Sequence, residues 1–481
     1  MSVDLALSLL LFAAFMAYAA RRLFVLLHVF QQEEYDAGRF LHGIFRSQNG
    51  RLVWEFWNLR NPSKKAKKPL KMTARAWRTY VVSLLVTAFF LSGWFSFPSW
   101  SKLVTTILIL ALLLPSFLAS SNFFLWPYER SNQRRYWRQA HEKLTRLGPV
   151  VIGITGSYGK TSVKHILAHI LAAAAPTLAT PGSVNTPMGV TRIIRERLEP
   201  RHKYFIVEMG AYGLGSIARL CDLAPPQHAI ITAIGPAHLE RFGSLATTAL
   251  AKAELAKAAT GTVVLPRALL EHAPFAQLYK SEPSRFVILD APEVTQEKDG
   301  LTVCIDDEKL HAPLYGLHHG ANVALAYTLA RALGLDPALI KETLRSVPQI
   351  EHRLAVTTYP TGAVLIDDAY NANPAGMRAA LDLLDFLADG HKRRVLVTPG
   401  VVELGAEHGP VHADLGAYAA QKADVIIAVA ARRIPSFVQA AQAAQVLEVQ
   451  RFSEAQAWLA AHTGPRDVIL IANDLPDILE G

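Results

Sequence analysis

Cysteine is almost absent from this chain of 481 residues, and acidic residues are scarce in its first third. Cys221 and Cys304 stand far apart and in no metal-ligand spacing, which argues against a disulfide framework and favours a reducing cytosolic compartment. Residues 1–150 hold 20 Lys and Arg against 7 Asp and Glu, whereas residues 151–481 hold 29 against 33. The positive excess therefore lies where basic residues alternate with long apolar runs, which indicates a membrane segment rather than a nucleic-acid partner.

Charged residues are nearly missing from three apolar stretches of the first third. These read "LALSLLLFAAFMAYAA" continuing to "LFVLLHVF", "YVVSLLVTAFFLSGWFSF" and "LVTTILILALLLPSFLASS", and each approaches the roughly 20 residues of a spanning helix. The first stretch lacks the basic start of a signal peptide, because Arg21 and Arg22 follow its apolar core. We expect residues 1–122 to form three transmembrane helices in the lipid bilayer; alternatively, one stretch is a buried or interfacial helix. Because His28 is nearly the only ionisable group in them, a transport pathway is disfavoured.

Positive charge is concentrated in the loop of residues 31–78. This loop holds 11 Lys and Arg, including "KKAKK" at positions 64–68, against 4 acidic residues. Cytoplasmic loops carry such an excess, so we predict a multi-pass protein of the cytoplasmic membrane with its N-terminus outside and everything after Ser121 in the cytoplasm. Residues 123–147 indicate an amphipathic basic linker helix against anionic headgroups; an ordinary solvated linker helix is the alternative.

A different pattern begins at Val150, where short β-branched runs alternate with stretches rich in alanine and leucine. Examples of such runs are "YFIVEMG", "HAIITAIG" and "RRVLVTPG". This alternation predicts a mostly parallel α/β architecture with helices on both faces of each sheet. A composition break in "VPQIEHR" separates a central P-loop α/β domain, residues 148–350, from a C-terminal Rossmann-like α/β domain, residues 351–481.

The first of these runs leads into the glycine-rich turn "GSYGKTS". The strict pattern G-x-x-x-x-G-K-[ST] is not met, because Ile154 stands five residues before Gly159. Even so, Gly156 and Gly159 allow the backbone to approach a phosphate, the following helix offers its N-terminus, and Lys160 adds a positive charge. Thr161, directly after the lysine, is placed to ligate Mg²⁺. The sequence therefore predicts a phosphate-binding loop, with a purely structural glycine turn as the alternative.

This turn and four later stretches resemble, in the same order, the Mur ligase superfamily, whose loop reads G-T-x-G-K-[ST]. The later stretches are "VEMGA", "GPAHLERFGSLATTALAKAEL", "GLHHGANVALA", and "HRLA" followed by "IDDAYNANP". The phrases "AHLERFGS" and "DDAYNANP" look most like the type that adds D-alanyl-D-alanine (MurF). The resemblance implies an α/β enzyme that uses ATP to form an amide through an acyl phosphate, and the apolar stretches of the first third add a membrane anchor.

The resemblance also implies which residues hold the cofactors. ATP would be bound by both domains, through Gly156, Ser157, Gly159, Lys160, Thr161, Ser162, Asn322, Arg353 and Asp368. Two Mg²⁺ ions would be held by Thr161, Glu208, His238 and Lys252. Lys160, His238 and Lys252 would be the catalytic residues.

Some of these roles are more specific. Lys252 would be carbamylated by CO₂, which turns a cation into a carboxylate-like ligand. Asn322 would face adenine, Arg353 would reach phosphate and Asp368 would hold the ribose hydroxyls. The family usually has His-Asn where this chain has His318-His319.

Taken in isolation, the metal-site residues have ordinary explanations. Glu208 would then be a surface acid, His238 a core histidine, and Lys252 a helix-surface lysine paired with Glu254 or with neighbours of Lys257.

The chain departs from this family at both ends. Apolar stretches take the place of a soluble UDP-sugar domain, and the final "VILIANDLPDILEG" replaces a lysine-glycine-serine turn. We expect a ligase at the cytoplasmic membrane face that joins an amino acid or dipeptide to a carboxylate of a cell-wall precursor, UDP-linked or lipid-linked. A ligase of a poly-γ-glutamate-like polymer is the alternative, and a membrane ATPase or transport-associated protein is less favoured. No nucleic-acid partner is expected, and the amine, the acceptor and the oligomeric state stay open.

Thiol labelling in intact cells tests the orientation. In a background without Cys221 and Cys304, a cysteine at Lys65 should be shielded from a membrane-impermeant reagent, whereas cysteines at Ser99 and Ser101 should react. Permeabilised cells, in which all three sites should react, provide the control. Labelling of the cysteine at Lys65 from outside would reverse the orientation and remove access to cytosolic ATP.

Overall fold

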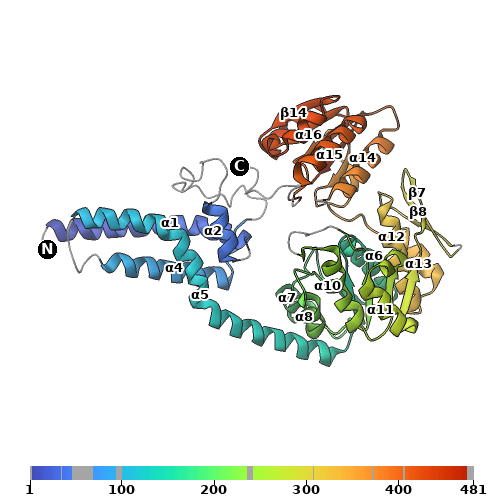
Figure 1. Ribbon diagram of the computed structural model, residues 1–481, viewed down its shortest axis with the longest axis horizontal. Coiled ribbons are helices and arrows are strands. Elements are labelled where there is room, and N and C mark those ends of the chain that lie inside the picture. The colour runs from blue at the N-terminus through green and yellow to red at the C-terminus, as the bar shows by residue number, and fades with distance from the viewer. Residues whose placement is uncertain are drawn as a thin grey trace. The chain divides into compact units, whose positions relative to one another are not determined.

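The computed structural model describes residues 3–33, 35–45, 69–93, 100–235, 242–306, 308–370, 373–402, 404 and 407–473. The chain divides into two compact units, Met1–Arg135 and Tyr136–Gly481 (Figure 1). The basic run at positions 64–68, Ser99 of the expected turn, His238 and the last eight residues lie outside the described ranges.

The first unit is helical in its described part. It contains α1 (Val3–Gln32), α2 (Ala37–Phe45), α4 (Ala74–Ser92) and the first part of α5 (Trp100–Leu147). Three helical segments are long and apolar enough to cross a membrane: Leu9–Gln32, Ala74–Ser92 and Leu103–Leu147. The third apolar run and the basic linker form one continuous helix of 48 residues. The linker continues the helix because it is rich in strong helix formers such as Arg, Gln, Glu, Ala and Leu.

Polar contacts join the helices of this unit where α4 and α5 meet. Arg78 donates from Nε and Nη2 to Glu129 Oε1, at 2.8 and 2.6 Å. Arg75 Nη2 donates to Asn122 Oδ1 at 3.0 Å, and its guanidinium lies 4.1 Å from the centre of the Tyr35 ring. Arg78 and Arg75, which lie beside this apolar bundle, thus each have a polar side-chain partner on α5.

The second unit begins with a six-stranded parallel sheet in the order β2-β3-β1-β4-β5-β6. Its strands are β1 (Val150–Thr155), β2 (Thr177–Ala179), β3 (Tyr204–Glu208), β4 (His228–Ile231), β5 (Val263–Pro266) and β6 (Phe286–Leu289). The helices of this central domain are α6 (Lys160–Ala174), α7 (Pro187–Arg197), α8 (Ser216–Leu223), α10 (Leu245–Ala258), η3 (Arg267–Glu271), α11 (Ala273–Ser281), η4 (Pro283–Arg285), α12 (His318–Ala332) and α13 (Pro337–Leu344).

Alternating residues of this sheet face two separate cores. Ile152 and Ile154 pack with α6, α12 and α13, whereas Val151 packs with α7, α8, α10 and the end of α5. Side chains of a strand point alternately to its two faces, so helices cover both faces as expected. Next to this sheet lies a small antiparallel one, formed by β7 (Glu293–Glu297), β8 (Gly300–Ile305) and β9 (Glu308–Ala312).

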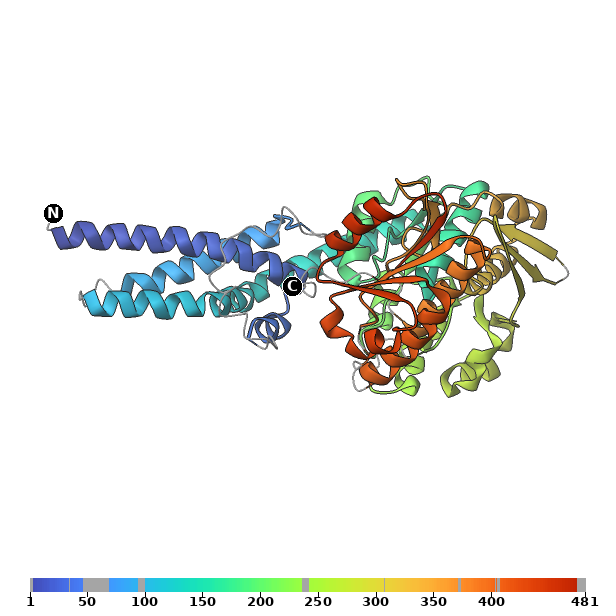
Figure 2. The ribbon, with the colours of Figure 1, turned by 90° about the horizontal axis from the view of Figure 1, so that it is seen from above.

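The second sheet of this unit has the order β10-β11-β15-β12-β13-β14, and only β10 runs antiparallel to its neighbour. Its strands are β10 (Ala355–Thr358), β11 (Val364–Asp368), β12 (Arg393–Thr398), β13 (Val425–Val429), β14 (Gln445–Val449) and β15 (Asp467–Ala472). Its helices are α14 (Pro374–Ala388), α15 (His408–Lys422), η6 (Ala431–Arg433), α16 (Pro435–Ala440) and α17 (Phe452–His462) (Figure 2). Residues of α14, α15 and α16 pack on one face of the sheet and residues of α17 on the other, so the α/β architecture is confirmed.

The strand register brings several loop residues of the first sheet to one edge. Ile154 of β1 pairs with Glu208 of β3, and Thr155 pairs with Ile231 of β4. The segments that follow these strands therefore meet at the carboxyl edge of the sheet, where parallel α/β sheets bind ligands.

Candidate active site

The turn after β1 requires glycine at two positions. Gly156 has a φ of 155° and Gly159 a φ of 79°, and both values disfavour a side chain. A Cβ at Gly156 would lie 1.9 Å from Thr232 Oγ1, and one at Gly159 would lie 2.5 Å from Asn322 Oδ1. The first N–H groups of α6, which starts at this turn, have no intrahelical acceptor. The turn thus provides bare backbone and free N–H groups, which suit a phosphate.

Lys160 lies folded over this turn. Its Nζ donates to Gly156 O at 2.7 Å and to Ser157 O at 3.3 Å. Burial lowers the pKa of Lys160, Glu208 raises it, and the charges of Arg353 and Lys164 lower it further. Its ammonium therefore lies on the loop itself, where the negative charge of a phosphate would replace carbonyl dipoles as its partner.

Glu208, at the end of β3, is the centre of the site and is 1% exposed. Its Oε2 accepts from Lys164 Nζ at 2.8 Å and from Thr161 Oγ1 at 3.0 Å, and its Oε1 accepts from Asn185 Nδ2 at 3.1 Å. Burial raises the pKa of Glu208, but Lys164, Lys160 and Thr161 together bring it below the ordinary value. Glu208 is therefore an ionised buried carboxylate and not a surface acid.

The oxygens of Thr161 and Glu208 fit a magnesium ion. Thr161 Oγ1 and Glu208 Oε2 lie 3.0 Å apart, and two neighbouring ligands at about 2.1 Å in an octahedron lie about 3.0 Å apart. A hydroxyl and an ionised carboxylate are also the hard oxygen ligands that Mg²⁺ prefers. In this structure the Lys164 ammonium is the cation next to Glu208.

Lys252 on α10 is 5% exposed, and the structure gives it no hydrogen bond or ion pair with any described residue. Burial, and secondarily the charge of Lys160, lower the pKa of Lys252 to about 7. Glu254 is occupied elsewhere, because it accepts from the N–H groups of Gly215 and Ala218 at the start of α8, at 2.6 and 2.8 Å. The alternative of a surface lysine paired with Glu254 is therefore wrong.

Asn322 lies against the phosphate loop, since its Oδ1 is the nearest atom to a Cβ at Gly159. Its Nδ2 lies 3.3 Å from His319 Nδ1. Burial holds the pKa of His319 well below its usual value, so this ring is neutral near pH 7. The adenine contact expected of Asn322 stays a prediction.

Arg353 precedes β10, and Asp368 is the last residue of β11 in the second sheet. Arg353 is half-buried; burial lowers its pKa, and the negative charges of Asp368 and Glu208 raise it. Asp368 is 2% exposed and accepts from Leu354 N–H at 3.2 Å. Arg353 thus lies within electrostatic reach of the phosphate loop, while its phosphate contact and the ribose contact of Asp368 stay predictions.

Four residues that contact this site were not expected from the sequence: Thr180, Lys164, Asn185 and Thr232. The Oγ1 of Thr180 accepts from Glu208 N–H at 3.2 Å. Lys164 follows Lys160 by one helical turn, so the spacing alone could have placed it on the same face of α6. No pattern in the sequence indicates the contact of Asn185 with Glu208.

The two serines expected at the phosphate loop lie on it and on α6. Ser157 Oγ accepts from Gly235 N–H at 3.0 Å and so holds the loop to the segment after β4. Ser162 is buried on α6.

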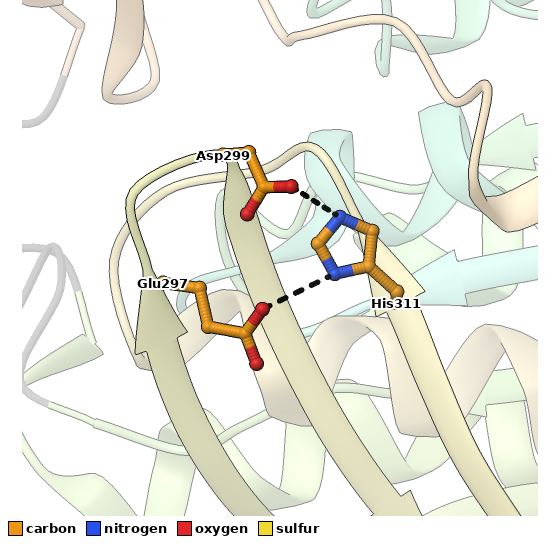
Figure 3. A group of neighbouring side chains, drawn as sticks. All are labelled: Glu297, Asp299 and His311. Atoms are coloured by element: carbon orange, nitrogen blue, oxygen red, sulfur yellow. Dashed lines mark ion pairs between the residues drawn. The ribbon is translucent and has the colours of Figure 1, made fainter.

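A second group of charged side chains lies on the small sheet (Figure 3). His311 Nδ1 lies 3.8 Å from Glu297 Oε2, and Nε2 lies 3.8 Å from Asp299 Oδ2. A cation bound at one ring nitrogen would lie away from the carboxylate at the other nitrogen. Because both acids are also exposed, we interpret the group as surface ion pairs and leave it outside the active site.

Two family models match the second unit. The Mur ligase middle domain matches residues 154–330, and the Mur ligase glutamate ligase domain matches residues 352–473. The UDP-N-acetylmuramoyl-tripeptide–D-alanyl-D-alanine ligase of Synechocystis is 34% identical over 331 residues, which are 68% of this chain and 70% of the relative. The enzyme of that name from Mycobacterium tuberculosis (strain CDC 1551 / Oshkosh) is 34% identical over 287 residues, so the chain spans only 56% of that relative's length.

Solved structures agree with these matches. MurF from Acinetobacter baumannii has a TM-score of 0.61 and 25% identity, covering 73% of this chain and 81% of that one. MurF from Thermotoga maritima, solved in complex with ADP, has a TM-score of 0.59 and 24% identity, covering 72% and 82%. The family resemblance inferred from the sequence motifs is thereby confirmed.

The pKa of Lys252 predicts how it reacts with CO₂. Only an unprotonated amine forms a carbamate, and a pKa of about 7 leaves Lys252 largely unprotonated above that pH. With ¹³C-bicarbonate, the ¹³C NMR spectrum should show a carbamate signal that grows as the pH rises through about 7. Lys252→Arg should remove the signal, and Lys257→Arg, at an exposed position of the same helix, should keep it. A signal that survives Lys252→Arg would place the carbamate elsewhere.

Proposed function

The chain belongs to the Mur ligase family, and on this premise we propose that it is an ATP-dependent ligase that forms an amide bond in peptidoglycan synthesis. The amine would belong to an amino acid or a dipeptide such as D-alanyl-D-alanine, and the carboxylate to a muramoyl-peptide precursor. The observation that carries this proposal is a phosphate loop that contacts a buried ionised Glu208 and lies within electrostatic reach of a buried Lys252, which has no partner among the described residues.

The first step of such a reaction makes the carboxylate electrophilic. The γ-phosphoryl group of ATP passes to a carboxylate oxygen, which gives an acyl phosphate and ADP. The loop from Gly156 to Gly159 and the N-terminus of α6 would hold the phosphates, and Lys160 would neutralise charge that develops during transfer. Because the reactants are anions, these groups lower the barrier mainly by positioning and by charge.

Thr161 and Glu208 would hold one Mg²⁺, and carbamylated Lys252 would hold a second, so that the metals neutralise charge on the phosphates and the acyl phosphate. Lys252 suits this role because it is buried, lies within electrostatic reach of Lys160, and has no competing partner among the described residues. His238 lies outside the described residues, and we assign it to these Mg²⁺ sites on the family pattern alone.

In the second step the amine attacks the acyl carbon and inorganic phosphate leaves. Arg353, from the segment after the central domain, would contact the phosphates, and Asp368 would hold the ribose. Since these residues follow the central domain, ATP would bind between two domains whose closure completes the site.

We further propose that the helices of the first unit anchor the enzyme in the cytoplasmic membrane, with both ligase domains in the cytoplasm. Trp77, Phe123, Phe124 and Trp126 are all more than half exposed on α4 and α5, as expected of aromatic side chains at a membrane interface. Such an anchor favours an acceptor presented at the membrane, such as a lipid-linked muramoyl-peptide.

Substitution of Lys160 tests the nucleotide chemistry. In mild detergent the parent should release ADP in the presence of D-alanyl-D-alanine and either UDP-linked or lipid-linked muramoyl-tripeptide. Lys160→Ala should reduce that rate by about 10²- to 10³-fold, the range seen when one group that stabilises transition-state charge is removed. Lys257→Ala should retain the parental rate. Parental turnover by a folded Lys160→Ala protein would exclude this lysine from the site.

Substitution of Lys252 tests the carbamate. Lys252→Ala and Lys252→Arg should both lose amide formation, because neither side chain can carry a carbamate, and the parent should slow when CO₂ is removed. Recovery of the parental rate on adding back bicarbonate is the control. If Lys252→Arg is as active as the parent, a positive charge suffices and the carbamate is not needed.

A further inference from the structure

The segment between α13 and β10 has a strained backbone at two positions. His352 has a φ of 60° and Leu354 a φ of 53°, and both values fall in the left-handed region that residues other than glycine rarely adopt. Such conformations cost free energy, so they persist only where surrounding contacts hold them, and they are common at functional sites. The two residues stand on either side of Arg353, which is expected to reach the nucleotide phosphates.

His352 is held to the end of β11 by its side chain and by its backbone. Its Nδ1 lies 2.8 Å from Asp367 Oδ2, and its carbonyl oxygen accepts from Tyr370 N–H at 3.3 Å. The centre of its ring lies 4.3 Å from the centre of the Tyr370 ring. Asp367 Oδ1 accepts from Ala369 N–H at 3.1 Å, so the carboxyl group that faces His352 is itself oriented. These contacts offset the strain at His352.

Leu354 is held by its backbone and by its side chain as well. Its N–H donates to Asp368 Oδ1 at 3.2 Å, next to the acid that faces His352. Its side chain is 1% exposed, and a Cβ at Gly316 would lie 2.3 Å from Leu354 Cδ1, so it packs against the turn that leads into α12. Leu354 thereby connects the end of β11 with the start of α12, the helix that carries Asn322.

The side chain of Arg353, between these two fixed residues, lies within electrostatic reach of the phosphate loop. Its charge acts on Lys160 of the loop, and the negative charges of Asp368 and Glu208 act on it. No described residue forms a hydrogen bond or an ion pair with its guanidinium. Because no partner among them fixes the guanidinium itself, the backbone on either side determines the direction in which the side chain leaves the segment.

We propose that His352 and Asp367 are positioning residues, whose contact holds the backbone before Arg353 so that its guanidinium faces the nucleotide phosphates. The inference rests on the proposed function, which assigns a phosphate contact to Arg353, and it adds the pair of residues that orients this contact. Neither residue of the pair has to touch the nucleotide. Orientation matters because a guanidinium binds phosphate through a planar set of N–H donors, and its direction decides how many of them reach the phosphate oxygens.

The experiment measures nucleotide binding rather than turnover. Isothermal titration calorimetry of the full chain in mild detergent, with a non-hydrolysable ATP analogue and Mg²⁺, gives a Kd for each variant. Arg353→Met should raise the Kd by on the order of 10- to 100-fold, the range expected for hydrogen bonds to a charged group. His352→Gly leaves the backbone free to adopt the left-handed conformation and removes only the side chain. This variant and Asp367→Ala should each raise the Kd by on the order of 10-fold, because they misdirect Arg353 without removing it.

A double-mutant cycle tests whether the pair acts through Arg353. In the Arg353→Met background, His352→Gly should change the Kd by less than about twofold, because the group that His352 positions is gone. His352→Asn keeps an N–H donor on a residue that tolerates the left-handed region, so it should recover part of the parental affinity. His311→Ala removes the histidine of the surface ion pairs on the small sheet and should bind the analogue as the parent does.

Hydrogen exchange of the protein without nucleotide separates a local change from unfolding. In His352→Gly, the amides of residues 352–354 should exchange faster than in the parent, whereas those of β11 and β15 should exchange at the parental rate. Where Asp367→Ala, at the end of β11, also loosens these strands, the Kd of His352→Gly decides.

The two levels of proposal fail in different ways. A parental Kd in His352→Gly would overturn the positioning role, and so would an equal loss of affinity in both backgrounds, since the effect would then not pass through Arg353. A parental Kd in Arg353→Met would overturn the phosphate contact and the inference with it. A folded parent that binds the analogue but forms no amide with any acceptor and amine pair would overturn the ligase function alone.

Discussion

The buried carboxylate of Glu208 is the constraint on which the candidate site depends. An ionised acid that is 1% exposed must be compensated, and Lys164, Thr161 and Asn185 all contact it. Removing one partner of such a buried ion pair typically costs about 3–5 kcal/mol. The three partners come from α6 and from the segment after β2, so the need to compensate one charge fixes the phosphate loop relative to its neighbours.

Two buried lysines near this charge have different chemistry because only one is paired. Lys164 is 2.8 Å from Glu208 and also donates to Gly182 O, so its ammonium is fully paired. Lys252 is equally buried but has no partner among the described residues, and its pKa falls to about 7. Burial with a partner gives a structural cation, whereas burial without one gives a nucleophile that can react with CO₂.

The sequence predicted the α/β fold and the phosphate loop because both depend on local patterns. Alternating apolar runs specify strands, and Gly156 and Gly159 are required by their own backbone angles. The partners of Glu208 are harder to predict, because Asn185 reaches it across 23 positions through the packing of a loop. That Lys252 has no partner among the described residues is a tertiary property of the same kind, because no spacing in the sequence shows which charges are paired.

The charges around the phosphate loop bear on the order of events in the proposed reaction. The charges of Arg353 and Lys164 act on Lys160, and the negative charge of Glu208 acts on Lys160 and, after that of Asp368, on Arg353. The loop is therefore cationic before a nucleotide binds, which favours capture of a triphosphate. The charge of Lys160 also contributes to the low pKa of Lys252. Bound phosphates would offset that charge and raise the pKa, so the reaction of Lys252 with CO₂ is favoured before the nucleotide binds.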